Sequence, residues 1–244
     1  MSVSHFTGPG NAPRTPRPLA SPARDLALWW CALAHDDADL PAMWAALAPE
    51  EVARAERFGT DALRRRYVAG RWALRWTLAQ RLGVEPAAVP IRRGARGRPM
   101  LDEGRAPDFN VSHTLGVALI AHLDRPGSRV GVDIAGVDRT LSHDGLARKF
   151  LTERERDAIA LRDDDGRRRA FLRLWTCKEA MSKATGDGLA APFREIGIAT
   201  GRGLVVEEGE GAYAPGRWTL HPVDVSADLY ATVALWSADP SGPR

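Results

Sequence analysis

Residues 129–139 read RVGVDIAGVDR, an apolar run with a single acid, Asp133, near its middle. A bounded run of this kind, rich in valine and isoleucine, is typical of a buried strand. A lone carboxylate in such a strand would cost several kcal/mol, on the order of the penalty for burying an unpaired ion. We therefore expect a cation close to Asp133. It is either a basic side chain that stabilises the fold or a metal ion that takes part in a reaction.

The composition places the chain among globular proteins. It has 244 residues, of which 44% are hydrophobic and 27% are charged, so it is long enough for one large domain or two small ones. Its uncharged apolar stretches are much shorter than the ~20 residues that cross a bilayer, so we expect no membrane span. The first 24 residues contain five prolines and no acid, lack a signal-peptide pattern, and are expected to be a disordered tail.

Cysteine content and net charge indicate the cellular location and the kind of partner. Two cysteines, Cys31 and Cys177, do not make a disulfide framework, which favours a reducing, cytoplasmic location. The formal charge of +3 comes mainly from arginines, many of them in the first half, and favours anionic partners. A solvated basic face is the alternative explanation for the same charge.

Hydrophobic periodicity predicts an α+β fold in which both halves pair strands with helices. Strands are expected at 26–34, 109–123 (after an initial turn), 129–137, 193–200, 216–223 and 228–237. Helices are expected at 49–82, ended by Gly83, at 152–162, opened by a Thr152–Glu155 capping box, and at 165–185, ended by Gly186. The similar order of strands and helices in the two halves suggests a duplicated unit. The expected divisions are a tail at 1–24, an N-terminal lobe at 25–127, a C-terminal lobe at 128–238 and a tail at 239–244.

The last of these helices contains WTCKEAMSK, residues 175–183. Glu179 and Lys183 are four residues apart and project from the same face, where a surface ion pair would be an ordinary explanation. Asp133 changes the interpretation, because two carboxylates with nearby lysines could line one pocket above Trp175. Two carboxylates suit a hard cation such as Mg²⁺, and Lys183 could then hold a phosphate oxygen.

These motifs together match a known family. VGVD (130–133) followed by WTCKEAMSK resembles the two-part signature of the 4′-phosphopantetheinyl transferases. NVSHT (110–114) resembles the Asn-x-Ser-His motif of the larger, surfactin-type branch, in which one chain carries two homologous halves. RGRP (96–99) resembles its Gly-Lys-Pro motif with Arg98 in place of lysine, and RRYVAGRWALR (65–75) resembles its helix of phosphate-binding basic residues.

The resemblance implies a fold and a reaction. The expected fold has two similar α/β lobes in a pseudo-twofold arrangement, with the active site at their interface. The expected reaction moves the 4′-phosphopantetheine arm of coenzyme A to a serine of an apo acyl, peptidyl or aryl carrier protein, as in secondary metabolism, and releases adenosine 3′,5′-bisphosphate. The implied cofactor is Mg²⁺ or Mn²⁺. Because both halves lie in one chain, a monomer is expected. The expected partners include neither a nucleic acid nor a membrane.

The resemblance also assigns residues. Asp133 and Glu179 would bind the metal, Glu179 would take the serine proton directly or through water, and Lys183 would contact the pyrophosphate. These three are the expected catalytic residues. The remaining residues expected at coenzyme A are Ser112, His113 at a phosphate, Arg66 and Arg75 at the 3′-phosphate, Arg98 and Pro99 at the adenine, and Lys178 as a supporting cation.

Ala135 departs from the family pattern, in which the residue two after the signature aspartate is commonly a glutamate and a third metal ligand. Strand alternation puts position 135 on the same side as Asp133, and we expect water to fill the missing coordination place. Ala135 also motivates one alternative, a decayed homologue that binds coenzyme A or a carrier without reacting. A second alternative is a basic nucleotide- or nucleic-acid-binding module, although the arginines do not interleave with aromatic residues as in such modules.

Overall fold

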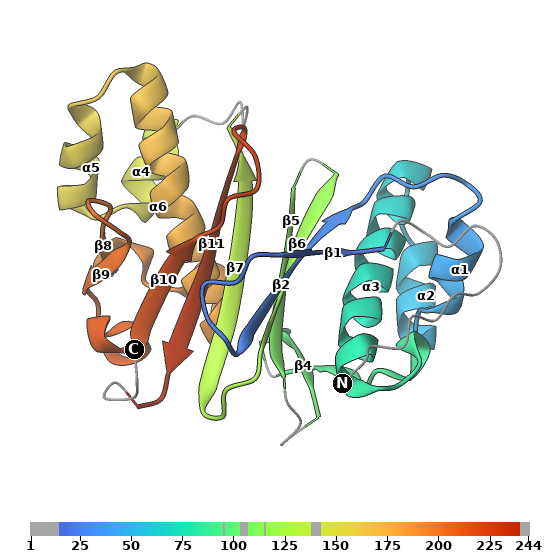
Figure 1. Cartoon of the computed structure of the whole chain (residues 1–244). Helices are drawn as coiled ribbons and strands as arrows, with labels where there is room; N and C mark the ends of the chain where they lie inside the picture. Colours follow the sequence, from blue (N-terminus) through green and yellow to red (C-terminus); the bar gives the residue numbers. More distant parts are fainter. Residues whose placement is uncertain (1–14, 95, 103–106, 115, 138–142, 240–244) are drawn as a thin grey trace. The chain divides into compact units, whose positions relative to one another are not determined.

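The computed structural model describes residues 15–94, 96–102, 107–114, 116–137 and 143–239, and its mixture of helices and strands confirms the α+β class (Figure 1). The chain divides into two compact units that interleave along the sequence. Unit 1 comprises Met1–Pro18, Trp29–Val89 and Gly116–Ala118, and unit 2 comprises Leu19–Leu28, Pro90–Leu115 and Leu119–Arg244. The boundary predicted between residues 127 and 128 falls inside unit 2. In the described part of the chain, no helix has the length and apolar character needed to cross a bilayer.

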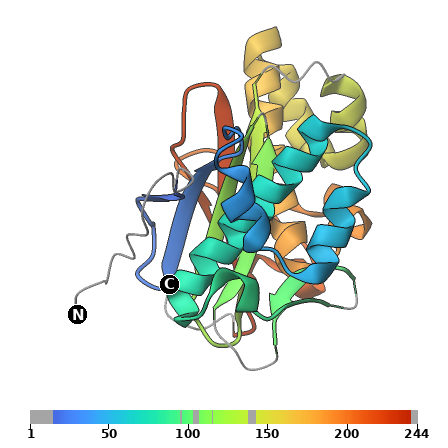
Figure 2. The ribbon, with the colours of Figure 1, turned by 90° about the vertical axis from the view of Figure 1, so that its right-hand side faces the viewer.

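Unit 1 is built around one long helix, α3 (Asp61–Leu82), against which α1 (Leu40–Ala45) and α2 (Pro49–Glu56) pack (Figure 2). The Thr60 hydroxyl caps the start of α3 by accepting a hydrogen bond from the Leu63 amide. Gly83 ends it with a left-handed φ of 68°, as predicted. The single helix expected at 49–82 is therefore two helices, because Thr60 opens a new one. A short 3₁₀ helix, η1 (Pro86–Ala88), follows.

A four-stranded sheet has the order β1 (Arg17–Leu19), β2 (Leu26–Ala32), β6 (Val117–Leu123), β5 (Asp108–Thr114). Strand β1 lies within the predicted tail and corrects that expectation at its residues, while residues 1–14 lie outside the described part of the chain. The turn and single strand expected at 109–123 are instead the two strands β5 and β6. A separate hairpin pairs β3 (Ile91–Arg93) with β4 (Pro99–Leu101).

Unit 2 contains an antiparallel sheet of order β10 (Trp218–Pro222), β11 (Leu229–Ser237), β7 (Ser128–Gly136). These strands confirm three of the predicted ones. The long helix α6 (Asp164–Thr185) packs on β7 and β11 and ends at Gly186 as predicted. Its companions α4 (His143–Phe150) and α5 (Glu153–Ala160) pack on α6, and the predicted capping box opens α5. The remaining elements are η2 (Gly188–Ala190), η3 (Phe193–Glu195), β8 (Gly197–Ala199), β9 (Val205–Glu208), η4 (Gly211–Tyr213) and η5 (Pro215–Arg217).

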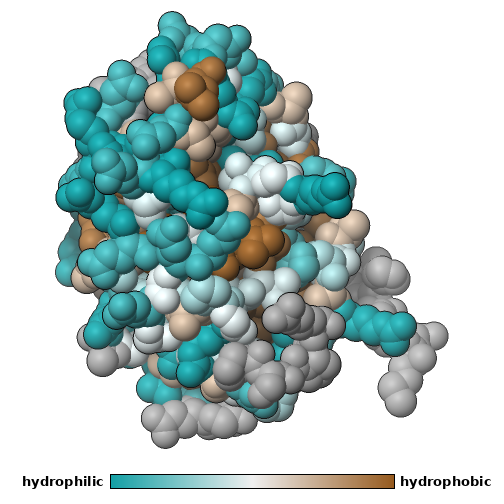
Figure 3. Space-filling view, turned by 90° about the vertical axis from the view of Figure 1, so that its left-hand side faces the viewer, coloured by the Kyte–Doolittle hydropathy of each residue, from teal (hydrophilic) through white to brown (hydrophobic). Residues whose placement is uncertain are grey.

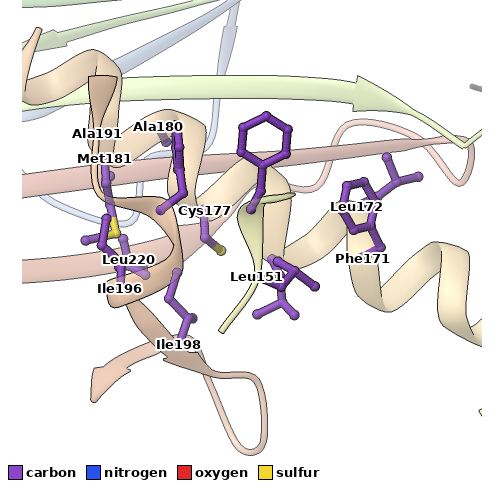
Figure 4. Close-up of a cluster of buried hydrophobic side chains, with 14 of the residues drawn as sticks. Leu151, Phe171, Leu172, Cys177, Ala180, Met181, Ala191, Ile196, Ile198 and Leu220 are labelled. Atoms are coloured by element: carbon purple, nitrogen blue, oxygen red, sulfur yellow. The ribbon is translucent and has the colours of Figure 1, made fainter. Parts of the chain in front are cut away.

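The hydrophobic core of unit 2 surrounds α6, with side chains from α4, α5, η3, β8, β9 and the three-stranded sheet. Figure 4 shows how Phe171, Leu172, Cys177 and Met181 of α6 gather with Leu151 and other buried side chains. Fully burying a large apolar side chain contributes roughly 1.5–3 kcal/mol, so this cluster holds α6 against the elements around it. Figure 3, which views the side of the molecule that carries α5, shows a mostly hydrophilic surface with small separate apolar areas.

The two cysteines provide a direct test of burial. Cys31 of β2 and Cys177 of α6 are free and buried, and burial raises the pKa of each thiol to about 12. Because the thiolate is the reactive species, neither should react with a thiol reagent such as DTNB at about pH 8 in the folded protein. Both should react once the protein is unfolded in guanidinium chloride. Stoichiometric reaction of either thiol before unfolding would contradict the burial described.

Candidate active site

The backbones of α6 and β7 approach each other closely at Gly131. A Cβ atom at this position would overlap the carbonyl oxygen of Ala180 and lie 2.7 Å from the amide nitrogen of Ala184. Only a residue without a side chain allows this approach. Because side chains alternate along a strand, Asp133 points to the same side of β7 as Gly131 would. The close approach therefore brings the side chain of Lys183, the neighbour of Ala184, beside Asp133.

Asp133 is bound by a lysine from α6. The Lys183 ammonium donates a hydrogen bond to Asp133 Oδ1 at 2.6 Å, and the Ser112 hydroxyl donates to the same oxygen at 2.8 Å. Ser112 Oγ also accepts a hydrogen bond from Lys183 Nζ at 2.8 Å. Because Asp133 is only 6% exposed, these charge-assisted contacts replace the water that its carboxylate loses. The basic side chain expected near Asp133 is confirmed, and a metal ion in addition to it stays a prediction.

This cluster opens into a pocket of about 280 Å³. The lining residues come from β5, β7 and α6, all within unit 2, and they are Val111, Ser112, His113, Thr114, Asp133, Ile134, Trp175, Glu179 and Lys183. The pocket brings together five of the residues that the sequence assigns to the site, namely Asp133, Glu179, Lys183, Ser112 and His113. His113 is the exposed member of this group. An active site between two lobes stays a prediction, because the pocket as described belongs to one unit.

Strand β5 is tied to β7 by its side chains, although the two strands belong to different sheets. Alternate β5 residues accept hydrogen bonds from alternate β7 amides, and we call this set the β5 ladder. Its members are Asp108 with Val130 N at 2.7 Å, Asn110 with Val132 N at 3.1 Å and Ser112 with Ile134 N at 3.4 Å. Donors and acceptors two residues apart on both strands fix the register, which places Ser112 beside Asp133. From the sequence, Asp108 had no expected role and Asn110 was noted only as part of the NVSHT motif; the alternation of polar residues at 108, 110 and 112 is the signal that could have identified the ladder.

The donor set of the pocket fits a magnesium ion. Among the described residues, no group of three or more His, Cys, Asp or Glu side chains is placed to hold a metal. Two carboxylates, Asp133 and Glu179, line the pocket, and both hydrogen bonds given above for Asp133 go to Oδ1, which leaves Oδ2 for a metal. Mg²⁺ usually takes one or two protein carboxylates and completes its shell with water and phosphate oxygens.

Position 135 lies in apolar surroundings. Ala135 is 2% exposed and belongs to the hydrophobic cluster of unit 2, against which Trp175 and Tyr230 also pack. Alternation along β7 puts it on the α6 side with Asp133, as expected. A carboxylate at this position would have to extend past these apolar side chains to reach the pocket.

Lys178 does not belong to the pocket, which corrects the sequence expectation. Its ammonium is fully buried and donates to Phe150 O at 3.1 Å, Glu155 Oε2 at 2.6 Å and Phe193 O at 2.7 Å. Burial lowers the pKa of Lys178, and the Glu155 carboxylate opposes that effect. Consecutive residues of a helix do not face the same way, so Lys178 points into the core while Glu179 lines the pocket. All three of its protons are used to hold α6 to its neighbours.

Arg75 is likewise an internal contact, in unit 1. It is 1% exposed, and its Nε donates to Glu51 Oε2 at 2.5 Å. Its Nη1 donates to three carbonyl oxygens between Pro86 and Val89. A guanidinium enclosed in this way cannot meet a phosphate of a ligand, which corrects the expected role of Arg75. Arg66 is exposed on α3, and its contact with coenzyme A stays a prediction.

Pro99 begins β4 and Arg98 directly precedes it, in unit 2. Pro99 is half-buried, and its place beside adenine stays a prediction. The side chain of Arg98 is only 11% exposed and forms a two-point ion pair with Asp108. Its guanidinium is thus turned toward protein groups.

Comparison with known proteins agrees with the motifs. Residues 129–234 match a model described as the 4′-phosphopantetheinyl transferase superfamily, and residues 34–123 match one described as 4′-phosphopantetheinyl transferase, N-terminal. The 4′-phosphopantetheinyl transferase HetI of Nostoc is 37% identical over 212 residues, which cover 85% of this chain and 86% of that protein. The chain belongs to the 4′-phosphopantetheinyl transferase family.

Two further similar proteins share less sequence with this chain. The 4′-phosphopantetheinyl transferase Sfp of Bacillus subtilis is 22% identical over 152 residues, which cover 62% of this chain and 66% of that protein. The solved structure of holo-[acyl-carrier-protein] synthase from Thermotoga maritima is 21% identical, with a TM-score of 0.37, and covers 45% of this chain and 62% of that one.

The contact at Gly131 can be tested in this family member by Gly131→Ala. The added methyl group overlaps the α6 backbone, so we expect the free energy of unfolding to fall by about 1–3 kcal/mol, the usual cost of overpacking. Denaturation in urea measures this change. Gly201→Ala is the matched control, because among the described residues, its chain neighbours aside, no atom lies within 4 Å of the Cβ it would add. Equal stability of the two variants would contradict the close approach of α6 to β7.

Proposed function

We propose that the chain transfers the 4′-phosphopantetheine arm of coenzyme A to a serine hydroxyl of an apo carrier protein and releases adenosine 3′,5′-bisphosphate. The observation that carries the proposal is the pocket in which Asp133, Lys183, Ser112 and Glu179 meet, in a chain that belongs to the transferase family. Its volume of about 280 Å³ is near the lower end of small-molecule sites. That size suits the diphosphate of coenzyme A better than the whole molecule.

The charges of the pocket suit this reaction. The serine oxygen attacks the phosphorus that carries pantetheine, a new P–O bond forms, and the bond from that phosphorus to the bridging oxygen breaks. Lys183 uses two of its three protons on Asp133 and Ser112, which leaves one for a phosphate oxygen. Glu179 takes the serine proton, directly or through a water molecule. His113, exposed at the rim, contacts a second phosphate oxygen.

The proposed cofactor is Mg²⁺, with Asp133 and Glu179 as its protein ligands. When bound, it would neutralise charge on the diphosphate. Arg66 and Pro99 are retained as proposed contacts to the adenosine part of coenzyme A. The match of two consecutive family models within one chain supports the single-chain, surfactin-type arrangement.

Intact mass spectrometry tests the activity. We expect an apo carrier protein, incubated with this chain, coenzyme A and Mg²⁺, to gain the mass of one phosphopantetheine arm. Lys183→Ala should slow the transfer by roughly 10²–10³-fold, as when a group that stabilises transition-state charge is removed. Lys149→Ala is the matched control, because Lys149 is exposed and lies outside the pocket, and it should keep the full rate.

The alternatives give different results in the same assay. Binding of coenzyme A without any gain of mass across a panel of acyl, peptidyl and aryl carriers would identify a decayed homologue. Retention of nucleic acid without binding of coenzyme A would identify a basic binding module. Either outcome would overturn the proposed transfer.

The metal requirement is tested by Ala135→Glu. We expect transfer by the natural chain to depend on Mg²⁺ with two protein carboxylates as ligands, and the added carboxylate to lower the Mg²⁺ concentration that gives half of the maximal rate. The variant should also be less stable, because the longer side chain enters an apolar cluster. Rates are measured over a series of Mg²⁺ concentrations after treatment with EDTA. If the natural chain shows no metal-dependent transfer at any concentration, the proposed metal site is lost.

A further inference from the structure

Arg98 contacts three separate segments of unit 2. Its Nη1 and Nη2 donate to the two carboxylate oxygens of Asp108 on β5, at 2.9 and 2.8 Å. Its Nη2 also donates to Val130 O on β7 at 2.9 Å, and its Nε donates to Lys183 O on α6 at 2.9 Å. The side chain is 11% exposed. One largely covered guanidinium therefore joins β5, β7 and α6.

The contacts of Arg98 with β5 and β7 are linked through Asp108. Asp108, which pairs with Arg98, also accepts the amide hydrogen of Val130 at 2.7 Å. The ion pair therefore satisfies both the N–H and the C=O of Val130, at the first step of the β5 ladder. Two-point pairing of arginine with carboxylate is both strong and directional, so it fixes the positions of the two strands.

The contact to α6 caps the end of the helix. Lys183 lies in its last turn, where carbonyl groups have no amide partner within the helix. The amides of Gly186 and Asp187 both donate to Ser182 O, and Arg98 supplies the donor for Lys183 O. A cation at a helix C-terminus is also favoured by the helix dipole. Arg98 thus holds the backbone of the residue whose side chain binds Asp133 and Ser112.

We propose that Arg98 is a positioning residue, which fixes the last turn of α6 against β5 and β7 so that Lys183 Nζ stays on Asp133 and Ser112. The catalytic importance of this positioning rests on the proposed function, in which Lys183 contacts the diphosphate. The positioning role replaces the expectation that Arg98 contacts adenine, because the guanidinium donates its hydrogen bonds to protein acceptors.

The position requires arginine rather than any cation. The planar guanidinium presents donors in a fork, which here reach a carboxylate and two carbonyl groups in different directions. A lysine has a single nitrogen and cannot span these acceptors. Arg98→Lys therefore keeps the charge, restores the residue of the motif that RGRP resembles, and removes the fork. A ligand-binding role and a positioning role predict opposite results for this variant.

Amine labelling reports the position of Lys183 without any need for catalysis. The chain contains only three lysines, Lys149, Lys178 and Lys183. Lys149 is exposed, Lys178 is fully buried, and Lys183 is held by Asp133. Reductive methylation followed by peptide mass spectrometry gives the rate at each lysine. We expect the order Lys149, Lys183, Lys178, from fastest to slowest, in the natural chain.

In Arg98→Lys, labelling of Lys183 should accelerate about tenfold, the factor that corresponds to ~1.4 kcal/mol. Lys178 should stay slow, since it reports that the core of unit 2 is intact. Arg96→Lys is the matched control. Arg96 lies two residues earlier, is 69% exposed and pairs with Asp187, so its replacement should leave the rate at Lys183 unchanged.

Steady-state kinetics distinguish a positioning role of Arg98 from direct contact with coenzyme A. With an apo carrier protein, Arg98→Lys should lower kcat about tenfold and change the KM for coenzyme A by no more than about twofold. Its preference for coenzyme A over 3′-dephospho-coenzyme A should equal that of the natural chain. A raised KM with an unchanged kcat would assign Arg98 to the ligand and overturn the proposal.

The two hypotheses fail in different ways. If the natural chain transfers nothing to any carrier, the proposed function fails, and the labelling rates still decide whether Arg98 positions Lys183. If Lys183 is labelled equally fast in Arg98→Lys and the natural chain, the positioning role is overturned even where transfer is efficient. Should rapid labelling of Lys178 reveal an unfolded variant, Asp108→Asn removes the charge that orients Arg98 and should accelerate labelling of Lys183 alone. An unchanged rate in Asp108→Asn would overturn the proposal.

Discussion

The carboxylate of Asp133, buried in a strand and bound by the ammonium of Lys183, is the contact on which the architecture of unit 2 depends. A buried acid demands a cation, and the cation comes from a helix that must therefore lie very close to the strand. Gly131 removes the side chain that would prevent this approach. The β5 ladder then brings the Ser112 hydroxyl to the same carboxylate oxygen. The close packing at Gly131, the register of β5 and the charge of Asp133 together place Asp133, Lys183 and Ser112 in one polar cluster that lines a pocket.

Basic residues paired with buried carboxylates serve two different roles in the described part of the chain. Lys178 and Arg75 are enclosed by carboxylate and carbonyl acceptors, and they hold secondary structure elements together. Lys183 is different, because its side chain is 27% exposed and borders the pocket. A lysine that keeps a proton available at a pocket can meet a phosphate, whereas one surrounded by protein acceptors cannot. The number of acceptors around each cation, rather than its place in a motif, separates a structural role from a chemical one.

Much of the fold could be predicted from periodicity and end signals. The strand around Asp133, the helix ended by Gly186 and the Thr152 capping box depend on local interactions, which the sequence displays directly. The break between α2 and α3 was missed, because apolar spacing continued across Thr60 and a cap is a weaker signal than periodicity. The β5 ladder was missed for another reason. Its partners are 22 residues apart, and side chains bonding to the backbone of another strand leave only a short polar alternation in the sequence.

By itself, the sequence determined that Asp133 needs a cation, that Glu179 and Lys183 share a helix face, and that the chain carries the motifs of a transferase family. The tertiary structure decided which of the basic residues reaches Asp133. Lys178 and Lys183 belong to the same nine-residue motif, yet one points into the core and the other to the pocket. The packing of α6 on β7, β11 and its companion helices fixes how the helix is turned about its axis. The role of Arg98 was decided in the same way, since its acceptors lie up to 85 residues away from it in the chain and meet only when the strands and the helix end are in place.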